Sequence, residues 1–422
     1  MELIRRLHAR LGDFWWYTAM VFLSTRLADV LNIFVGLYLV PKYIATEELG
    51  AVLPLTSFAT FLALPAFAFA TTFSKELNTL AVNGKYGQMK TLIKSVFIAA
   101  GVFLVLAVGI SRLILPIFLK RIRIVEGSLG MLILLSAFLG CVSPVYTNAL
   151  QALKRFGAIS ALNLISAPLR LITMVLAMPF RALSGYFLGQ SATPSFTIVA
   201  SVWFLRKELS VKAEIYWTKP IVRRFTLLFI AILVYQLSGM FTGLIEPMVI
   251  REHLPEMESA AYYMVTRFSD IANYLTISFV TVLFPMTAEL AEKKSSTFPL
   301  VLRSSLAMLL GGGILAIFFA FFGGSLMMFL PHGLEYAAFS WAIPILVMIN
   351  VFSAIVTIIV NTEVSAARFK FLYWWLPTHL LSALVCYLLA ERGYLSSLSA
   401  MLWYFAVAAL VKFSFALTSL KK

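Results

Sequence analysis

The chain has 422 residues, of which 61% are hydrophobic and 13% charged, and its formal net charge is +15. Soluble domains are about half apolar and about a quarter charged, so this composition excludes a water-soluble fold and predicts one all-α integral membrane domain. The basic residues lie in short loops between apolar segments instead of in one patch with interleaved aromatic residues, which argues against nucleic-acid binding.

Apolar runs long enough to cross a bilayer recur from end to end of the sequence. A membrane-spanning helix needs about 20 predominantly apolar residues. The first run follows three arginines, is too long for a signal-peptide core and lacks a small-residue cleavage site, so we expect it to be retained. The sequence predicts about 12 spans, over residues 14–40, 49–73, 94–119, 128–152, 158–178, 183–205, 223–250, 260–288, 299–329, 336–362, 370–390 and 396–419.

The basic residues predict the orientation of these spans. With the N-terminus in the cytoplasm, the even-numbered connections and the termini carry about three times the Lys and Arg of the odd-numbered connections, as the positive-inside rule requires. We therefore expect a multi-pass protein of the inner or plasma membrane with both termini cytoplasmic. Lys120, Arg121 and Arg123 lie in an odd-numbered connection, and they indicate either contact with anionic headgroups or an error in the third span.

A polar stretch, RKELSVKAEIYWTKPIVRR at residues 206–224, divides the chain nearly in half. We expect an N-lobe at 1–205 with spans 1–6, a cytoplasmic linker at 206–222 and a C-lobe at 223–422 with spans 7–12. The ends of the second and eighth spans are weakly similar, which together with the equal span counts predicts two six-helix lobes around a central cavity. Transporters built from such repeats bind substrate between the halves.

Several ionisable residues fall inside the spans, where each costs at least about 2.5 kcal/mol and needs a partner, a cavity or a function. Arg26 and Asp29 in the first span, and Arg267 and Asp270 in the eighth, are three residues apart, so each pair shares a helix face. Both pairs could be self-neutralising. Alternatively, both faces line a water-filled cavity, because further polar residues continue them: Thr25, Asn32 and Gly36 in the first span, and Tyr263, Tyr274, Ser278 and Thr281 in the eighth.

Other polar residues are candidates for the same cavity. Arg170 in the fifth span has no acid nearby in its own helix, which favours a cavity-facing role. Glu246 precedes Pro247 and could line the cavity or lie near the outer interface, and Asn350 of the tenth span could join it. His379 lies beside an aromatic belt and is better interpreted as an interfacial hydrogen-bonding group. Since guanidinium groups bind phosphate bidentately, arginines in a cavity would suit a pyrophosphate-bearing lipid.

Motifs of catalysis are absent from the sequence. It contains no H-E-x-x-H, G-x-S-x-G, Walker or aspartate-rich motif, its four histidines are scattered, and Cys141 and Cys386 both lie inside predicted spans. We therefore expect no enzyme activity, no metal site and no cofactor. Without an ATP site, active transport would depend on the gradient of a coupling ion, Na⁺ or H⁺, or of the substrate itself.

Two stretches resemble the multidrug/oligosaccharidyl-lipid/polysaccharide (MOP) exporter superfamily, and within it the Wzx-type polysaccharide and O-antigen flippases. Residues 41–50, PKYIATEELG, are similar to the family's first periplasmic turn. Residues 246–290 are similar to its seventh and eighth spans, through Glu246, Ala261-Tyr262-Tyr263, Arg267, Phe284-Pro285 and Thr287. The family has aspartate where Glu246 stands and a glycine before the tyrosine, which places the role of Glu246 in question.

This resemblance implies a flippase that moves an undecaprenyl-diphosphate-type oligosaccharide across the cytoplasmic membrane by alternating access, for cell-surface polysaccharide synthesis. Arg26 and Arg267 would meet the phosphates, while the glycan occupies the cavity and the tail stays in lipid. The implied partners are the polyprenyl-diphosphate-linked glycan, membrane lipids, a polysaccharide polymerase and glycosyltransferases.

Three alternatives remain open. The Ala261–Phe268 stretch is also similar to MurJ-type lipid II flippases, whose first and eighth spans supply cavity arginines but which have fourteen spans. A cation-coupled multidrug and toxin extrusion (MATE) exporter shares the twelve spans and could use Asp29 for its coupling ion, although three arginines would repel organic cations. A membrane transferase would need catalytic acids or histidines and a large external loop, which the predicted topology does not provide.

Overall fold

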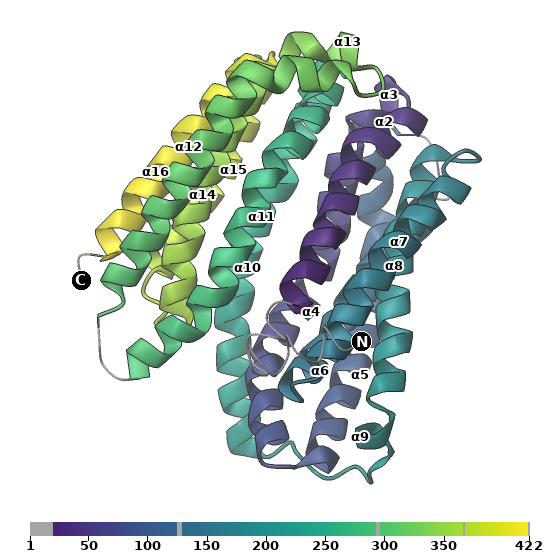
Figure 1. The fold of residues 1–422 in the computed structure, drawn as a ribbon, viewed down its shortest axis with the longest axis vertical. Helices are drawn as coiled ribbons and strands as arrows, with labels where there is room; N and C mark the ends of the chain where they lie inside the picture. The colour runs from purple at the N-terminus through teal and green to yellow at the C-terminus, as the bar shows by residue number, and fades with distance from the viewer. Residues whose placement is uncertain (1–19, 125–128, 293–295, 366–367, 421–422) are drawn as a thin grey trace, which may run out of the picture. The chain divides into compact units, whose positions relative to one another are not determined.

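The computed structural model describes residues 20–124, 129–292, 296–365 and 368–420, and these contain helices and turns with no strand (Figure 1). In this part of the chain, each expected span coincides with a long helix. Nine helices within it are long and apolar enough to cross a membrane. The predicted all-α, multi-pass membrane fold is therefore confirmed, with a helix count near twelve. The start of the first expected span, residues 14–19, lies outside the described residues.

The long helices are Met20–Tyr43, α4 (Val52–Val82), α5 (Tyr86–Arg121), α6 (Leu129–Ala152), α7 (Phe156–Ala177), α8 (Ala182–Phe204), α10 (Lys219–His253), α11 (Glu256–Glu292), α12 (Phe298–Met328), α14 (Ala342–Ser365), α15 (Leu372–Glu391) and α16 (Leu398–Leu420). The helix Met20–Tyr43, called the first helix below, contains the π-helical segment η1 (Val35–Leu39) and ends in α2 (Val40–Tyr43). Short helices occupy some of the connections: α3 (Thr46–Leu49), α9 (Arg206–Ser210), α13 (Gly333–Tyr336) and the 3-10 turn η2 (Ala337–Phe339).

Contacts between residues divide the chain into two compact units. Unit 1 comprises Met1–Val35, Phe58–Lys120 and Val125–Gln236, and unit 2 comprises Gly36–Ser57, Arg121–Ile124 and Leu237–Lys422. Three division points fall well inside long helices, at η1 of the first helix, within α4 and within α10, and a fourth precedes the last residue of α5. The lobes at 1–205 and 223–422 remain a prediction, since these units are drawn from contacts and interleave along the chain.

The polar stretch at 206–222 packs within unit 1. Tyr216 is buried and its hydroxyl donates a 2.8 Å hydrogen bond to the Glu76 carboxylate, which also pairs with Arg224. The Trp217 indole donates a 2.8 Å hydrogen bond to the Ser95 hydroxyl. Burial, followed by the hydrogen bond to Glu76, raises the pKa of Tyr216 above its usual value. Hydrogen bonds from Tyr216 and Trp217 therefore anchor a segment that, judged by its charges alone, would be expected to lie in solvent.

The packing of unit 2 is centred on α14, which contacts α11, α12 and α16. Figure 1 shows α12, α14 and α16 in the green-to-yellow part of the chain. A helix that is apolar around its whole circumference is expected to be buried, and Val347, Val351 and Val360 of α14 have no exposed surface. A Cβ added at Gly312 of α12 would lie 2.1 Å from the Val351 side chain, so this helix crossing depends on glycine.

The basic connection after α5 has a structural explanation within unit 2. Arg251 of α10 is 1% exposed, and it donates hydrogen bonds to the carbonyls of Ile122, at 3.0 Å, and Glu47, at 2.5 Å. Arg123 donates to the Glu252 carbonyl at 2.9 Å, and Arg121 lies 3.6 Å from the Glu252 carboxylate. These arginines bind protein acceptors, so their departure from the charge pattern does not require a different third span. The helix α5 covers that span and ends at Arg121.

Candidate functional site

The first helix carries an ion pair within unit 1. The Arg26 guanidinium lies 3.0 Å from the Asp29 carboxylate, and both side chains are partly exposed, at 28% and 16%. Arg26 also lies over the Phe22 ring, 5.3 Å from its centroid. The predicted spacing thus produces a direct pair, and the partial exposure leaves one side of it accessible.

Arg170 of α7 joins the same polar face. Its guanidinium donates one hydrogen bond to the Asn32 amide oxygen and one, at 3.4 Å, to Gln190 of α8. Gln190 in turn donates to the Tyr186 hydroxyl at 2.7 Å. About two turns closer to the start of the first helix, Thr25 accepts a 3.2 Å hydrogen bond from Asn163 of α7. The first helix, α7 and α8 are therefore joined through polar side chains inside unit 1, and we call this set the unit 1 network.

A second polar face lies on α11 in unit 2. The Arg267 guanidinium lies 3.0 Å from the Asp270 carboxylate and 5.1 Å from the Tyr263 ring centroid, and Asp270 accepts a 3.2 Å hydrogen bond from Asn273. Tyr263 donates a 3.1 Å hydrogen bond to the Gly36 carbonyl in η1. A Cβ at Gly36 would lie 2.9 Å from Cδ of Arg267. The π-helical segment η1 and the absence of a side chain at Gly36 together leave room for the Arg267 side chain.

The remaining predicted residues have other neighbours. Asn350 of α14 donates to the Ser269 hydroxyl at 3.1 Å, and Ser269 is fully buried, so this amide lies at the α11–α14 contact. Glu246 of α10 interacts electrostatically with Lys412 of α16. The side chains of Ser278, Thr281, Phe284, Pro285 and Thr287 lie outside the described part of the molecule.

Sequence reasoning missed three kinds of residue. Neutral polar residues of α7 and α8, such as Asn163 and Gln190, give no strong signal in an apolar helix. Lys412 does give one, because it is a charge in the middle of a predicted span and meets the criterion that selected Arg170. Arg251 was passed over because it lies near the end of its span, where a basic residue is ordinary.

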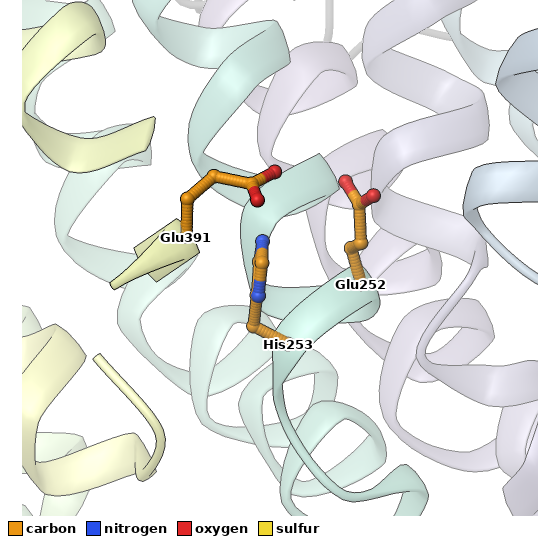
Figure 2. A group of neighbouring side chains, drawn as sticks. All are labelled: Glu252, His253 and Glu391. Atoms are coloured by element: carbon orange, nitrogen blue, oxygen red, sulfur yellow. The ribbon is translucent and has the colours of Figure 1, made fainter. Parts of the chain in front are cut away.

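A group of ionisable side chains lies where α10 and α15 end. Donor atoms of Glu252, His253 and Glu391 lie within 4.8 Å of one another, and Figure 2 shows His253 between the two glutamates. Arg121 interacts electrostatically with both carboxylates. We interpret the group as the acidic side of the ion pairing that holds residues 121–124, because an adjacent guanidinium disfavours a bound cation.

The fold matches solved transporters over nearly the whole chain. It is similar to the lipid II flippase MurJ in an inward closed conformation, with a TM-score of 0.68, 13% identity, and coverage of 96% of this chain and 88% of that one. An inward-facing multidrug resistance MATE family transporter of the MOP superfamily gives 0.62 and 13%, covering 94% of both chains. A MATE structure in the straight conformation gives 0.63 and 13%, covering 95% and 94%. The fold is that of the MurJ and MATE transporters.

Sequence comparison adds nothing to this result. No protein-family model matches the chain, and none of the curated proteins matches it in sequence. At 13% identity the structural similarity establishes the fold alone, so the substrate has to be argued from the side chains.

Proposed function

We propose that this chain is a flippase that carries a polyprenyl-diphosphate-linked oligosaccharide across the cytoplasmic membrane by alternating access, in the manner predicted for Wzx-type proteins. The observation that carries the proposal is the unit 1 network. It holds the guanidinium group of Arg170 on connected side chains of three membrane helices, and the Arg26–Asp29 pair lies on the first of these helices. The MOP-type fold is a second support, since one protein that shares it is a lipid II flippase.

The chemistry of the network suits a diphosphate. A guanidinium stays charged at any physiological pH and presents paired N–H donors that match phosphate oxygens. The amide oxygens of Asn32 and Gln190 orient Arg170 without adding a negative charge that would repel the ligand. In the proposed mechanism Arg26 exchanges Asp29 for a phosphate, and Arg267 of unit 2 does the same with Asp270. The polyprenyl tail remains in lipid throughout.

The glycan and its biosynthetic setting are part of the same proposal. The sugar portion, which is polar, would be carried past the network while the tail anchors the substrate in the membrane. Glycosyltransferases would act before this step, and a surface-polysaccharide polymerase would act after it. Orientation with both termini in the cytoplasm, predicted from the basic loops, would place substrate entry in the inner leaflet.

The test uses cells that lack the native gene and depend on the chain for export of surface glycan. Arg26→Ala, Arg170→Ala and Arg267→Ala should each reduce export at least about tenfold at equal protein level, because charge-assisted hydrogen bonds contribute about 1.5–3 kcal/mol each. Arg303→Gln, which removes an exposed charge from α12, is the matched control and should export normally. Normal export by all three alanine variants would refute the proposal.

Cation-coupled multidrug export is the second candidate. The MATE structures match the fold nearly as well as MurJ does, and Asp29 offers a carboxylate for a coupling ion. Arginines beside that carboxylate weigh against organic cations as substrates. Sodium- or proton-dependent drug resistance conferred by the chain, with no effect on surface glycan, would favour this candidate.

A further inference from the structure

A groove on the surface of unit 1 runs between α7 and α8. It has a volume of about 380 Å³, and all eight residues that line it are apolar, among them Ile165 of α7 and Val199 and Trp203 of α8. These three side chains are 51%, 71% and 58% exposed. Since both helices are of membrane-spanning length, a groove of this kind is suited to a hydrocarbon chain of the bilayer.

The groove faces away from the unit 1 network. At 3.6 residues per turn, Ile165 lies about 160° around α7 from Asn163, and Val199 lies about 180° around α8 from Gln190. Asn163 and Gln190 both belong to the network. A molecule in the groove would therefore lie on the opposite side of these helices from the side chains proposed to meet the transported substrate.

One end of the groove lies where α7 begins and α8 ends. Trp203 and Phe204 line the groove and are the last two residues of α8. Arg155, which directly precedes α7, donates a hydrogen bond to the Phe204 carbonyl and another to the Glu208 carboxylate. These bonds hold the two helix ends at one level, and they neutralise the carboxylate that follows α8.

Arg206 supplies a positive charge at this end of the groove. It is exposed, and its guanidinium lies 5.1 Å from the centroid of the Trp203 ring. Among the residues that the structure describes, no carboxylate pairs with Arg206. A guanidinium held over an aromatic face retains N–H donors at its edge for a phosphate. Lys154 and Lys207 are further exposed cations next to the same helix ends.

An apolar groove that ends at a cation is complementary to a lipid with an anionic head. Basic residues at the cytoplasmic ends of membrane helices bind anionic headgroups, and the basic loops predict that residues 206–222 are cytoplasmic. A zwitterionic headgroup would bring an ammonium close to Arg206, whereas an anionic phospholipid brings a phosphate without a second cation. The charge at the mouth of the groove therefore favours the anionic lipid.

We propose that the α7–α8 groove is a binding site for an anionic phospholipid of the membrane. One acyl chain lies in the groove, and Arg206 binds the phosphate. The site goes beyond the proposed function and does not rest on it, because the groove lies on the face of α7 and α8 opposite to the network. Its tests require no knowledge of the transported substrate.

The first test measures thermal unfolding of the purified full chain in an uncharged detergent with added phosphatidylglycerol or phosphatidylcholine. Phosphatidylglycerol should raise the unfolding temperature saturably, by about 2 °C or more beyond the effect of phosphatidylcholine. Arg206→Gln should require about fivefold more phosphatidylglycerol for the same shift, in line with the loss of one headgroup contact. Arg303→Gln, which removes an exposed charge from unit 2, is the control and should respond like the native chain. An unchanged response of Arg206→Gln would overturn the proposal.

The second test locates the lipid with brominated acyl chains, which quench tryptophan fluorescence on contact. At a low ratio of lipid to detergent, brominated phosphatidylglycerol should quench the native chain saturably, and Trp203→Phe should remove the larger part of this quenching. Ala200→Phe fills the groove and should also prevent it, with Ala161→Leu on the other wall as a second variant if the first does not fold. Ala307→Leu, at an exposed alanine of α12, should be quenched like the native chain. Native quenching in Trp203→Phe would contradict the site.

Competition with polyprenyl diphosphate separates two sources of a lipid phosphate. Polyprenyl diphosphate should displace brominated phosphatidylglycerol no better than unlabelled phosphatidylglycerol does. Displacement at an about tenfold lower concentration would assign the groove to the tail of the transported lipid, and it would overturn the proposal of a membrane phospholipid.

Discussion

Arg170 of α7 donates a hydrogen bond to Asn32 of the first helix and a second one to Gln190 of α8. One guanidinium group thereby fixes the side chains of two other helices within unit 1. The same group is the strongest candidate for contact with an anionic substrate. If Arg170 both joins the helices and contacts the substrate, a substitution that keeps its positive charge should lower export more than it lowers the unfolding temperature.

Arg170→Lys retains the charge and removes the planar fork. We expect the variant to fold, since an ammonium can still bond one amide oxygen, but to lose about 10- to 100-fold in glycan export because bidentate phosphate contact is lost. Export and unfolding temperature would be measured on the same preparations. If export and the unfolding temperature fell in proportion, Arg170 would have a structural role only.

Gly36→Ala should displace Arg267. The added Cβ would lie 2.9 Å from Cδ of Arg267, close to the base of the side chain, and so the arginine has to shift. We expect export to fall at least about fivefold, in line with loss of a charged contact. Gly311→Ala is the matched control, because nothing lies within 4 Å of its Cβ and alanine favours the helix by about 0.5–1 kcal/mol. Equal export by both variants would contradict the assignment.

Arg251→Met should destabilise the chain without a direct effect on substrate. The substitution leaves the carbonyls of Ile122 and Glu47 without the donors they now have, at a cost of about 1–3 kcal/mol for each lost bond. Thermal unfolding should show a clear drop. Lys120→Met, at an exposed site in the last turn of α5, should unfold like the native chain. A native-like temperature for Arg251→Met would show that these bonds do not hold the connection.

Tyr216→Phe removes the hydroxyl that donates to Glu76. Hydrogen bonds to a charged group contribute about 1.5–3 kcal/mol, so unfolding should occur at a lower temperature, whereas Tyr394→Phe at an exposed site should have no effect. The folded-state pKa of Tyr216 is raised above the ordinary value of 10.0. The advantage of tyrosine is therefore complete below pH 10 and diminishes as the pH rises above it. A difference that persists unchanged at higher pH would contradict this origin.

Much of the fold followed from the sequence because membrane insertion imposes a simple rule. A helix of the required length must be apolar, so the apolar runs located the helices to within a few residues, as for α6 at Leu129–Ala152. The spacing of three residues also predicted the Arg26–Asp29 and Arg267–Asp270 pairs correctly. Both results depend only on local geometry.

The remaining features depend on contacts between residues distant in the sequence. Nothing in the sequence near Arg121 and Arg123 indicates that Glu252 of α10 lies beside them, so a charge-counting rule registered them only as an exception. Likewise, Glu246 could be placed in its helix, but nothing in the sequence connects it with Lys412, which lies 166 residues away and interacts with it electrostatically. The substrate-contacting roles of the predicted site residues remain predictions.

The most direct test of the central claim uses proteoliposomes that contain the purified chain and a fluorescent oligosaccharide on polyprenyl diphosphate. A quencher that cannot cross the membrane would report how fast the label leaves the outer leaflet. The account predicts rapid movement with the native chain, little movement with Arg26→Ala or Arg170→Ala, and much weaker activity toward the same oligosaccharide on a neutral lipid. Equal movement of the diphosphate and neutral lipids, or native activity in both arginine variants, would contradict it.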